Sequence, residues 1–208
     1  MSRSSTPDFY RLVCSRRSIR QFQSRRLSRQ VLTRLVNVGR LAPSAANRQP
    51  LEFVVVDEPE KTRQIFSCLK WAAYIQPEGN PRPGHEPVAY IIVLVNQKIR
   101  ATDYERDVGA ALENMILVAW SWGIGSCWLI SIDREKVAQL INLPPNQYLI
   151  DSVLALGYPA EEPVVEETED DIRYWKDESG RLHVPKRKLA AVLHWNVYSP
   201  EPAKIDEI

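Results

Sequence analysis

Arg16-Arg17-Ser18-Ile19-Arg20 is the stretch of sequence from which the rest of the chain is best interpreted. It places three guanidinium groups and one hydroxyl within five residues. Guanidinium groups are planar, stay charged at working pH, and hold phosphate through paired, charge-assisted hydrogen bonds. The run therefore predicts a local anion site, although a solvated basic surface would have the same sequence.

The overall composition is that of an ordinary globular protein. Of the 208 residues, 44% are hydrophobic and 25% charged, which suffices for a core without disulfides or metals. The 27 basic and 26 acidic residues leave a net charge of +1, so no broad field favours nucleic acid or an anionic membrane. Cys14, Cys68 and Cys127 are too widely spaced for a zinc site or a disulfide framework, and we expect reduced thiols in the cytoplasm.

Two stretches of the sequence were considered as a secretory signal or a transmembrane helix. Residues 1–15 contain no apolar core of a secretory signal. Residues 115–132 carry no charge over eighteen positions, the lower limit for a transmembrane helix. Gly123 and Gly125 interrupt that stretch, which favours a helix, a tight turn and a buried strand. We therefore expect a soluble protein.

The hydrophobic pattern predicts one domain of mixed helices and strands, with no internal boundary. The continuous apolar run 88–96 indicates a strand covered on both faces. A helix over 107–122 is apolar nearly all round, so it must be buried in a core or against a partner subunit. The acidic segment 161–171 is interpreted as a solvated link. Further helices are predicted from Thr6-Pro7, over 28–41 and 60–71, and after Asp133, with further strands over 52–56, 127–132 and 149–156.

Two loops also stand out. Residues 43–50 offer hydroxyl and amide groups on a backbone that Pro43 and Pro50 stiffen, although a plain helix-to-strand connection would have the same composition. Residues 76–87 hold four prolines and two glycines in twelve positions. They predict either a mobile cover over a site or a surface excursion.

Several chemistries are excluded by the residues themselves. There is no P-loop or complete dinucleotide fingerprint, and the three histidines have no metal-ligand spacing. Ser18 and Ser44 lack the context of an acyl-transfer nucleophile, and Cys127 beside Trp128 is more typical of packing. Asp107 and Glu113 are explained by the preference of helix starts for acids. If the chain is an enzyme, a cofactor must carry the chemistry.

The order of six short motifs resembles the nitroreductase family of FMN-dependent oxidoreductases. The motifs are Arg-Arg-Ser-Ile-Arg, Pro-Ser-Ala-Ala-Asn-Arg-Gln-Pro, Asp107-Val108-Gly109-Ala110-Ala111 with Asn114, Gly-Ile-Gly-Ser-Cys-Trp, Ala155-Leu156-Gly157-Tyr158-Pro159 and a late Lys-Arg-Lys. Each motif alone is weak, but together they cover residues 9–195 in the family's order.

The resemblance implies an α+β, three-layer fold with a central mixed, mostly antiparallel sheet flanked by helices. It also implies an intertwined homodimer with FMN at its interface, NADH or NADPH as electron donor, and a C-terminal arm over 185–208 packing on the partner subunit. Arg16 and Ser18 would meet the phosphate of FMN with Arg17 beside them, and Arg20 would lie near the N1 and O2 edge of the ring. Close to the ring, and partly from the partner subunit, the resemblance places Pro43, Ser44, Ala45, Asn47 and Gln49. Beneath the ring it places Trp128, Leu129 and Ile130, with a backbone amide directed toward N5 or O4. At the phosphate it places Lys186 and Lys188.

The chain departs from the family at two places. Leu51 stands where members often carry Trp, and the region 71–104 is short and proline-rich. Trp71 and Tyr74 are candidates for the substrate-side wall, unless they serve only in core packing. We expect hydride transfer by a ping-pong mechanism to an electron-poor acceptor such as a quinone or nitro compound. The competing hypotheses are an oxygen-using or dehalogenating flavoenzyme and a flavin-binding sensor without turnover.

Overall fold

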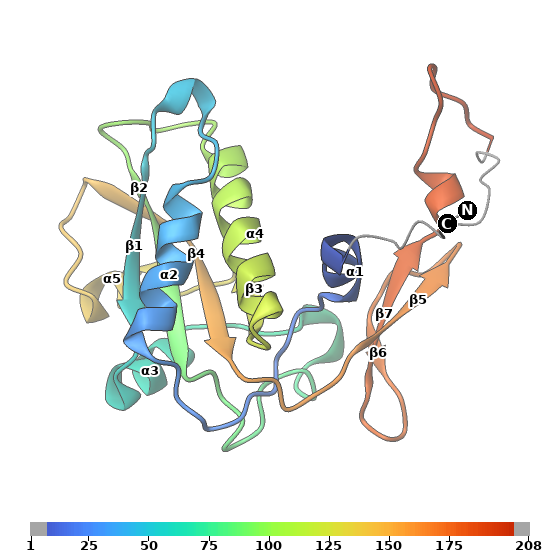
Figure 1. The fold of residues 1–208 in the computed structure, drawn as a ribbon. Coiled ribbons are helices and arrows are strands. Elements are labelled where there is room, and N and C mark those ends of the chain that lie inside the picture. The colour runs from blue at the N-terminus through green and yellow to red at the C-terminus, as the bar shows by residue number, and fades with distance from the viewer. Residues whose placement is uncertain (1–7, 202–208) are drawn as a thin grey trace. The chain divides into compact units, whose positions relative to one another are not determined.

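The computed structural model describes residues 8–201 (Figure 1). Within that range the chain forms two compact units, residues 8–161 and 162–201, and each is described by itself. The helix start predicted at Thr6 and Pro7, and the last residues of the predicted C-terminal arm, 202–208, lie outside the described residues.

A four-stranded sheet forms the centre of the first unit, in the order β1-β2-β4-β3. Each neighbouring pair is antiparallel, so the mixed sheet expected from the resemblance is an antiparallel one. The register shifts once, because Val93 pairs with Ser152 and Leu94 pairs with Ile150, which leaves one extra residue in β4 as a bulge. The strands are β1 (Leu51–Val56), β2 (Ala89–Asn96), β3 (Gly125–Leu129) and β4 (Tyr148–Gly157).

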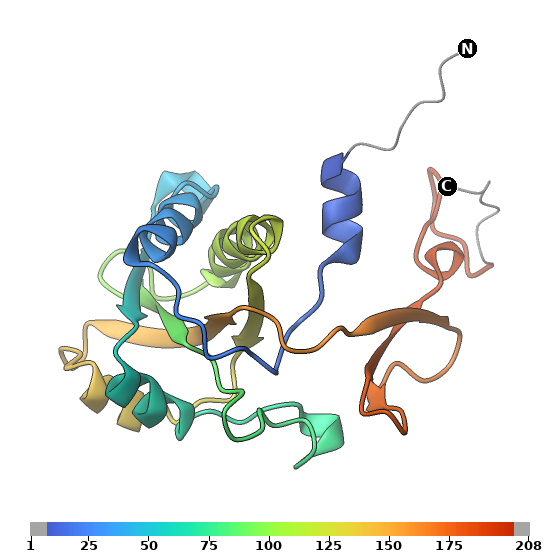
Figure 2. The same ribbon diagram turned by 60° about the horizontal axis from the view of Figure 1, so that its bottom comes forward.

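Helices cover both faces of this sheet and make three layers (Figures 1 and 2). α2 and α4 lie on one face, and α3 and α5 lie on the other, as Figure 2 shows. α1 adjoins α4, where the indole N–H of Trp120 donates to the Ser15 hydroxyl at 3.0 Å. The helices are α1 (Asp8–Ser15), α2 (Arg29–Arg40), α3 (Pro59–Phe66), α4 (Glu105–Ser121) and α5 (Arg134–Leu140), with single 3-10 turns at η1 (Ala45–Asn47) and η2 (Ala73–Ile75).

The main core lies between the sheet and the α2–α4 pair. Alternate residues of β2, from Ala89 to Val95, pack there with Leu32, Leu112 and Met115. A methyl group at Gly39 would lie 2.0 Å from the terminal methyl of the buried Met115, so a larger residue there would force that side chain to move. Every side chain of β2 before Asn96 is buried, which confirms the strand predicted to be covered on both faces.

Local interactions determine where α2 begins and where α3 ends. Ser28 caps α2, because its hydroxyl accepts the main-chain N–H of Val31 at 3.3 Å, as predicted. α3 ends at Phe66, five residues before its predicted end, where the chain turns to bridge Leu69 with Ile132. Among residues 8–201, no helix is long and apolar enough to cross a bilayer.

The second unit contains a three-stranded sheet in the order β5-β7-β6. β5 pairs with β7 in parallel, and β6 pairs with β7 in antiparallel fashion. The prediction of a solvated link over 161–171 is wrong, because β5 lies within it and pairs along its length with β7. The elements are β5 (Val164–Thr168), β6 (Trp175–Lys176), β7 (Leu182–Arg187) and the 3-10 turn η3 (Leu189–Ala191).

Candidate active site

The basic segment 16–20 lies along the outer edge of β3. Ser18 forms an isolated parallel bridge with Ser126, and the Ile19 amide donates to the Ser126 carbonyl at 2.9 Å. A side chain at Gly125 would lie 2.7 Å from Ile19 Cγ1, so only glycine permits this approach. The structure therefore brings together two segments that the sequence predicted for one ligand, although they are more than a hundred residues apart.

The guanidinium groups of this segment crowd one another. Partial burial, followed by the charge of Arg16, lowers the pKa of the Arg17 guanidinium, which still remains charged. Arg17 donates to the Cys14 carbonyl at 2.8 Å, and Arg16 faces Glu113 at 3.8 Å. That ion pair is long and partly solvated, so it contributes little. A bound anion would relieve the repulsion between the neighbouring cations.

The outer edge of β3 offers main-chain groups to solvent. The carbonyl of Ser126 points outward to Ile19, so the alternation of an antiparallel strand also directs the N–H and C=O of Trp128 outward. The Trp128 side chain is 39% exposed and that of Ile130 is 66% exposed, whereas Leu129 is buried. Trp128 and Ile130 thus form an apolar surface with a main-chain donor at its edge.

Cys127 is inward-facing and suited to packing, as the sequence indicated. Burial raises the pKa of its thiol, and the smaller opposing effect comes from Arg20, whose charge and hydrogen bond favour the thiolate. Arg20 therefore lies near Cys127 of β3, the strand that also carries the predicted ring contacts Trp128 and Leu129.

The loop 43–50 has an unusual backbone that is held by one buried acid. Ala46, Asn47 and Gln49 have φ values of 54°, 52° and 50°, in the left-handed region that non-glycine residues avoid. Asp107 accepts the Ser44 hydroxyl at 2.9 Å and the Ala45 amide at 3.1 Å. The sequence interpretation missed this role of Asp107, which it attributed to the preference of helix starts for acids.

The loop and the basic segment lie at opposite ends of the sheet. The Pro50 carbonyl accepts the amide of Asn96, which pairs with Tyr148 at the start of β4. Ser18 bridges Ser126, which pairs with Leu156 near the end of β4. Eight residues of strand separate these positions, or about 25 Å. Arg20 and Asn47, expected near one ring, are thus not brought together within one copy of the chain.

The two predicted substrate-side aromatic residues have different environments. Trp71 is buried and packs on Phe66 with ring centroids 5.9 Å apart, whereas Tyr74 is exposed in η2. The proline-rich loop after them is anchored by the buried side chain of Gln21. Its amide donates to the Asn80 carbonyl at 3.0 Å and its oxygen accepts the Arg82 amide at 3.0 Å.

The second unit holds Lys186 and Lys188, both exposed. The Lys188 ammonium pairs with Glu169 at 2.5 Å, and Lys186 stands opposite Glu167 in the β5–β7 register. Their expected contact with the FMN phosphate stays a prediction.

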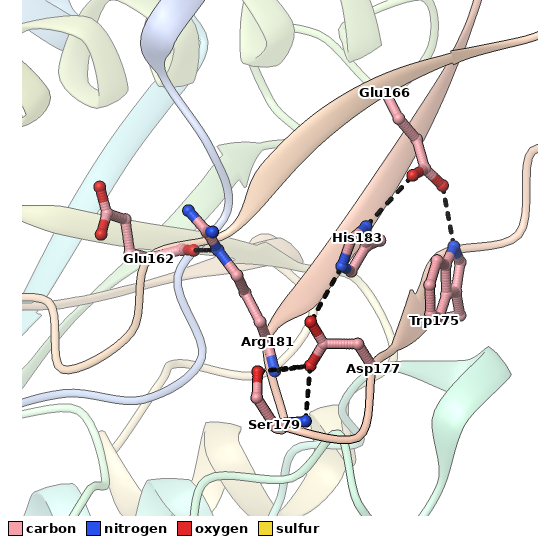
Figure 3. Close-up of polar contacts among 7 residues, drawn as sticks. All are labelled: Glu162, Glu166, Trp175, Asp177, Ser179, Arg181 and His183. Carbon is pink, nitrogen blue, oxygen red and sulfur yellow. Dashed lines mark hydrogen bonds and ion pairs between the residues drawn. The ribbon is translucent and has the colours of Figure 1, made fainter.

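A polar cluster on the same sheet was not predicted (Figure 3). His183 contacts Glu166 at 3.1 Å and Asp177 at 3.3 Å, and it stacks on Trp175 with ring centroids 4.1 Å apart. The hydrogen bond to Glu166 is the main cause that raises the pKa of His183, whereas hydrogen bonds led by the Ser179 hydroxyl lower the pKa of Asp177 to about 2. Within residues 8–201, no three histidine, cysteine or acidic side chains are grouped as metal ligands.

The fold and this geometry define an α+β protein with a basic segment, residues 16–20, at the edge of an antiparallel sheet. A sequence model described as the Nitroreductase family matches residues 13–158, and the chain belongs to that family. It is 32% identical over 167 residues to a protein of Archaeoglobus fulgidus named "Putative NADH dehydrogenase/NAD(P)H nitroreductase", covering 77% of this chain and 90% of the relative.

Two further similarities bear on the chemistry and the fold. The chain is 27% identical over 191 residues to "Iodotyrosine deiodinase" of Haliscomenobacter hydrossis, covering 78% of this chain and 84% of the relative. A crystal structure from Desulfovibrio desulfuricans, of "a putative nitroreductase in complex with fmn", superimposes with a TM-score of 0.66 at 22% identity. That comparison covers 94% of this chain and 100% of the other, and it shows a shared fold.

Proposed function

We propose that this chain is an FMN-dependent NAD(P)H oxidoreductase that acts as a homodimer by ping-pong hydride transfer. The acceptor would be an electron-poor compound such as a quinone or a nitroaromatic. The observation that carries the proposal is the placement of the 16–20 segment against the edge of β3. A charged donor set and an outward main-chain amide there fit a ligand with a phosphate and a planar polar ring.

The donor chemistry at this edge fits FMN. Arg16, Arg17 and Ser18 would bind the phosphate, and the crowding of the two guanidinium groups favours a dianion between them. Arg20 would stabilise negative charge at the N1 and O2 edge of the ring. The outward N–H of Trp128 would donate to the ring at N5 or O4, with Leu129 and Ile130 on the adjoining strand end. When bound, FMN supplies the acceptance and donation of hydride.

The separation of the two predicted ring-binding groups supports a homodimer. Asn47 and Gln49 lie about 25 Å along β4 from the basic segment, so they would reach the same ring as Arg20 only from a second copy. Apolar side chains that a second copy would cover are exposed on α1 and at the end of α4: Phe9, Tyr10, Val13 and Trp122.

The residues of the chain then have distinct tasks. The apolar surface of Trp128 and Ile130 would exclude water from one side of the ring and leave the other side open for donor and acceptor in turn. The loop anchored by Gln21 would cover the open side. A side-chain acid would not be required, because the proton that accompanies each hydride would come from solvent.

The visible absorption spectrum of the purified full-length protein tests the proposal, before and after anaerobic addition of NADH or NADPH. Flavin bands that bleach with either donor are the expected result. Bands that persist with both donors would contradict the oxidoreductase, and protein that stays colourless after addition of FMN would overturn the whole proposal.

The phosphate contacts are tested separately with Arg16→Ala. Loss of one charged hydrogen bond to a charged group costs about 1.5–3 kcal/mol, so FMN affinity should fall by roughly ten- to a hundred-fold. Arg34→Ala, which removes an exposed arginine of α2 outside this segment, is the matched control. Equal affinity of the two variants in a fluorescence titration would place the phosphate elsewhere.

A dehalogenating activity is the second candidate, and the similarity to the iodotyrosine deiodinase favours it over an oxygen-using enzyme or a sensor without turnover. It would use the same FMN site with a halogenated aromatic substrate. Reoxidation of the reduced protein by a quinone, a nitroaromatic and an iodinated phenol, each without oxygen, distinguishes the candidates. Release of iodide at a rate above quinone reduction would favour the deiodinase.

A further inference from the structure

Asp107 is the one buried carboxylate of the described first unit that is directed at the 43–50 loop. It is 4% exposed and lies in the first turn of α4. An acid at this position commonly binds the N–H groups of its own helix. Here Oδ2 accepts the hydroxyl of Ser44 and Oδ1 accepts the amide of Ala45, so both oxygens are used outside the helix.

The charge of this carboxylate is balanced within the protein. Arg100 Nη1 lies 3.6 Å from Oδ2, and the Arg100 side chain is itself largely buried. A buried carboxylate with a cation and two hydrogen-bond donors has a defined position, because its lone pairs are directed at fixed partners. A small cavity of about 140 Å³ beside it is lined by Pro43, Ser44 and Gln49.

From Asp107 the hydrogen bonds continue to the two predicted ring contacts. The Ser44 hydroxyl donates to Asp107 and accepts the main-chain N–H of Gln49 at 3.0 Å. The Gln49 side-chain amide in turn donates to the Asn47 side-chain oxygen at 3.1 Å. One carboxylate thereby supports the main chain of the loop through a single serine, and the two exposed amide side chains on that loop hydrogen-bond to each other.

The backbone between these contacts requires such support. Ala46, Asn47 and Gln49 are all in the left-handed region, and none of them is a glycine. Strained conformations of this kind persist only when surrounding contacts determine them, and they are concentrated at functional sites. A plain helix-to-strand connection, the simpler interpretation of the loop, would not need three strained residues held by a buried charge.

We propose that Asp107 is a positioning residue for the cofactor: through Ser44, it holds the 43–50 loop in the conformation that presents Asn47 and Gln49 to the flavin bound with the partner subunit. This inference rests on the proposed function. The role differs from helix capping, because the loop rather than α4 depends on it. Asp107 makes no contact with the reacting atoms and acts only through the loop.

The experiment compares Asp107→Asn and Ser44→Ala with Glu105→Gln, an exposed acid in the same first turn of α4. Hydrogen exchange is measured first on the full-length protein without FMN. Ser44→Ala removes the acceptor of the Gln49 N–H, and Asp107→Asn removes the charge and one of the two oxygens that hold Ser44 and Ala45. The Gln49 amide in Ser44→Ala and the Ala45 amide in Asp107→Asn should therefore exchange at least tenfold faster. Unchanged exchange in both variants would overturn the proposed support of the loop.

FMN binding is measured next, by fluorescence titration and by the visible spectrum of the bound flavin. Both test variants should bind FMN at least tenfold more weakly and shift its absorption bands, and Glu105→Gln should change neither. Faster exchange with unchanged affinity and spectrum would show a structural role only and would overturn the proposal. A wild-type chain that binds no FMN would instead overturn the proposed function and the cofactor role together.

A double-variant cycle separates positioning from general damage. If Asp107 acts through Asn47, then Asp107→Asn combined with Asn47→Ala should weaken FMN binding no more than the stronger single variant. Additive losses would contradict an action through Asn47.

Discussion

In residues 8–161, β2 runs through the middle of a sheet with every side chain from Ala89 to Val95 buried, whereas in residues 162–201 only Leu182 and Pro185 are buried. The first unit is stabilised by apolar packing between three layers. The second unit relies instead on polar contacts, with His183 between Glu166 and Asp177 and with Lys188 paired to Glu169. The stability of the first unit should therefore depend mainly on the volume of its buried side chains. The stability of the second unit should depend more on pH.

The largest effect is expected from a cavity in the first unit. Leu112→Ala removes a fully buried side chain from the core between α4 and the sheet, so it should lower the free energy of unfolding by about 2–5 kcal/mol. Urea unfolding of the full-length protein measures the loss. Val165→Ala, at a half-exposed position of β5 in the second unit, is the control. Similar losses for both variants would contradict the difference in packing.

A smaller loss is expected where the first unit has no room for an added atom. Gly125→Ala would push a methyl group to within 2.7 Å of Ile19, and relief of that clash should cost about 1–3 kcal/mol. Displacement of Ile19 should also weaken FMN binding, because Ser18 and Arg20 flank it. Gly109→Ala introduces the same methyl group in α4 with no atom within 4 Å, and it should gain about 0.5–1 kcal/mol of helix stability. Equal thermal unfolding of the two variants would remove the steric explanation.

The smallest effect is expected in the second unit and depends on pH. The hydrogen bond to Glu166 raises the pKa of His183 above its ordinary value of 6.5, so protonation favours the folded state. The contribution is therefore complete below pH 6.5 and is lost as the pH rises through the higher folded pKa. The lowered pKa values of Glu166 and Asp177 act in the opposite direction, and their contribution is lost as the pH falls.

An NMR titration of the His183 ring measures this pKa directly. Glu166→Gln should lower the pKa of His183 toward its ordinary value. Glu167→Gln removes the next carboxylate of β5, which points to the other face of the strand, and should leave the pKa of His183 almost unchanged. An equal decrease in the pKa of His183 in both variants would mean that this pKa depends on the overall charge nearby rather than on the hydrogen bond to Glu166.

Secondary structure was predicted best from the sequence where a local pattern of residues had a single physical explanation. The apolar run over β2 and the serine cap of α2 were both confirmed. β5 was missed because Glu166 and Glu167 resemble a solvated segment, and only the fold shows that β7 pairs with them. A parallel partner nearly twenty residues away leaves no local pattern.

The candidate site could be predicted in its parts but not in its arrangement. The motifs indicated the basic segment and the β3 strand, whereas their side-by-side placement depends on the contact of Ile19 with Gly125. The left-handed conformation of Ala46 had no signal, because alanine rarely adopts it. Asp107 was interpreted as part of the helix start, since a sequence does not show which way a carboxylate points.

The half-covered edge of β3 has a consequence for handling the protein. Ser18 and Ile19 cover this edge at Ser126, but the main chain at Trp128 is left facing outward beside an exposed indole. An uncovered strand edge is a template on which other chains can add strands and aggregate. The same edge is where FMN and the second subunit are proposed to bind. At equal protein concentration, preparations without FMN should therefore precipitate sooner than FMN-saturated ones, and added FMN should slow aggregation.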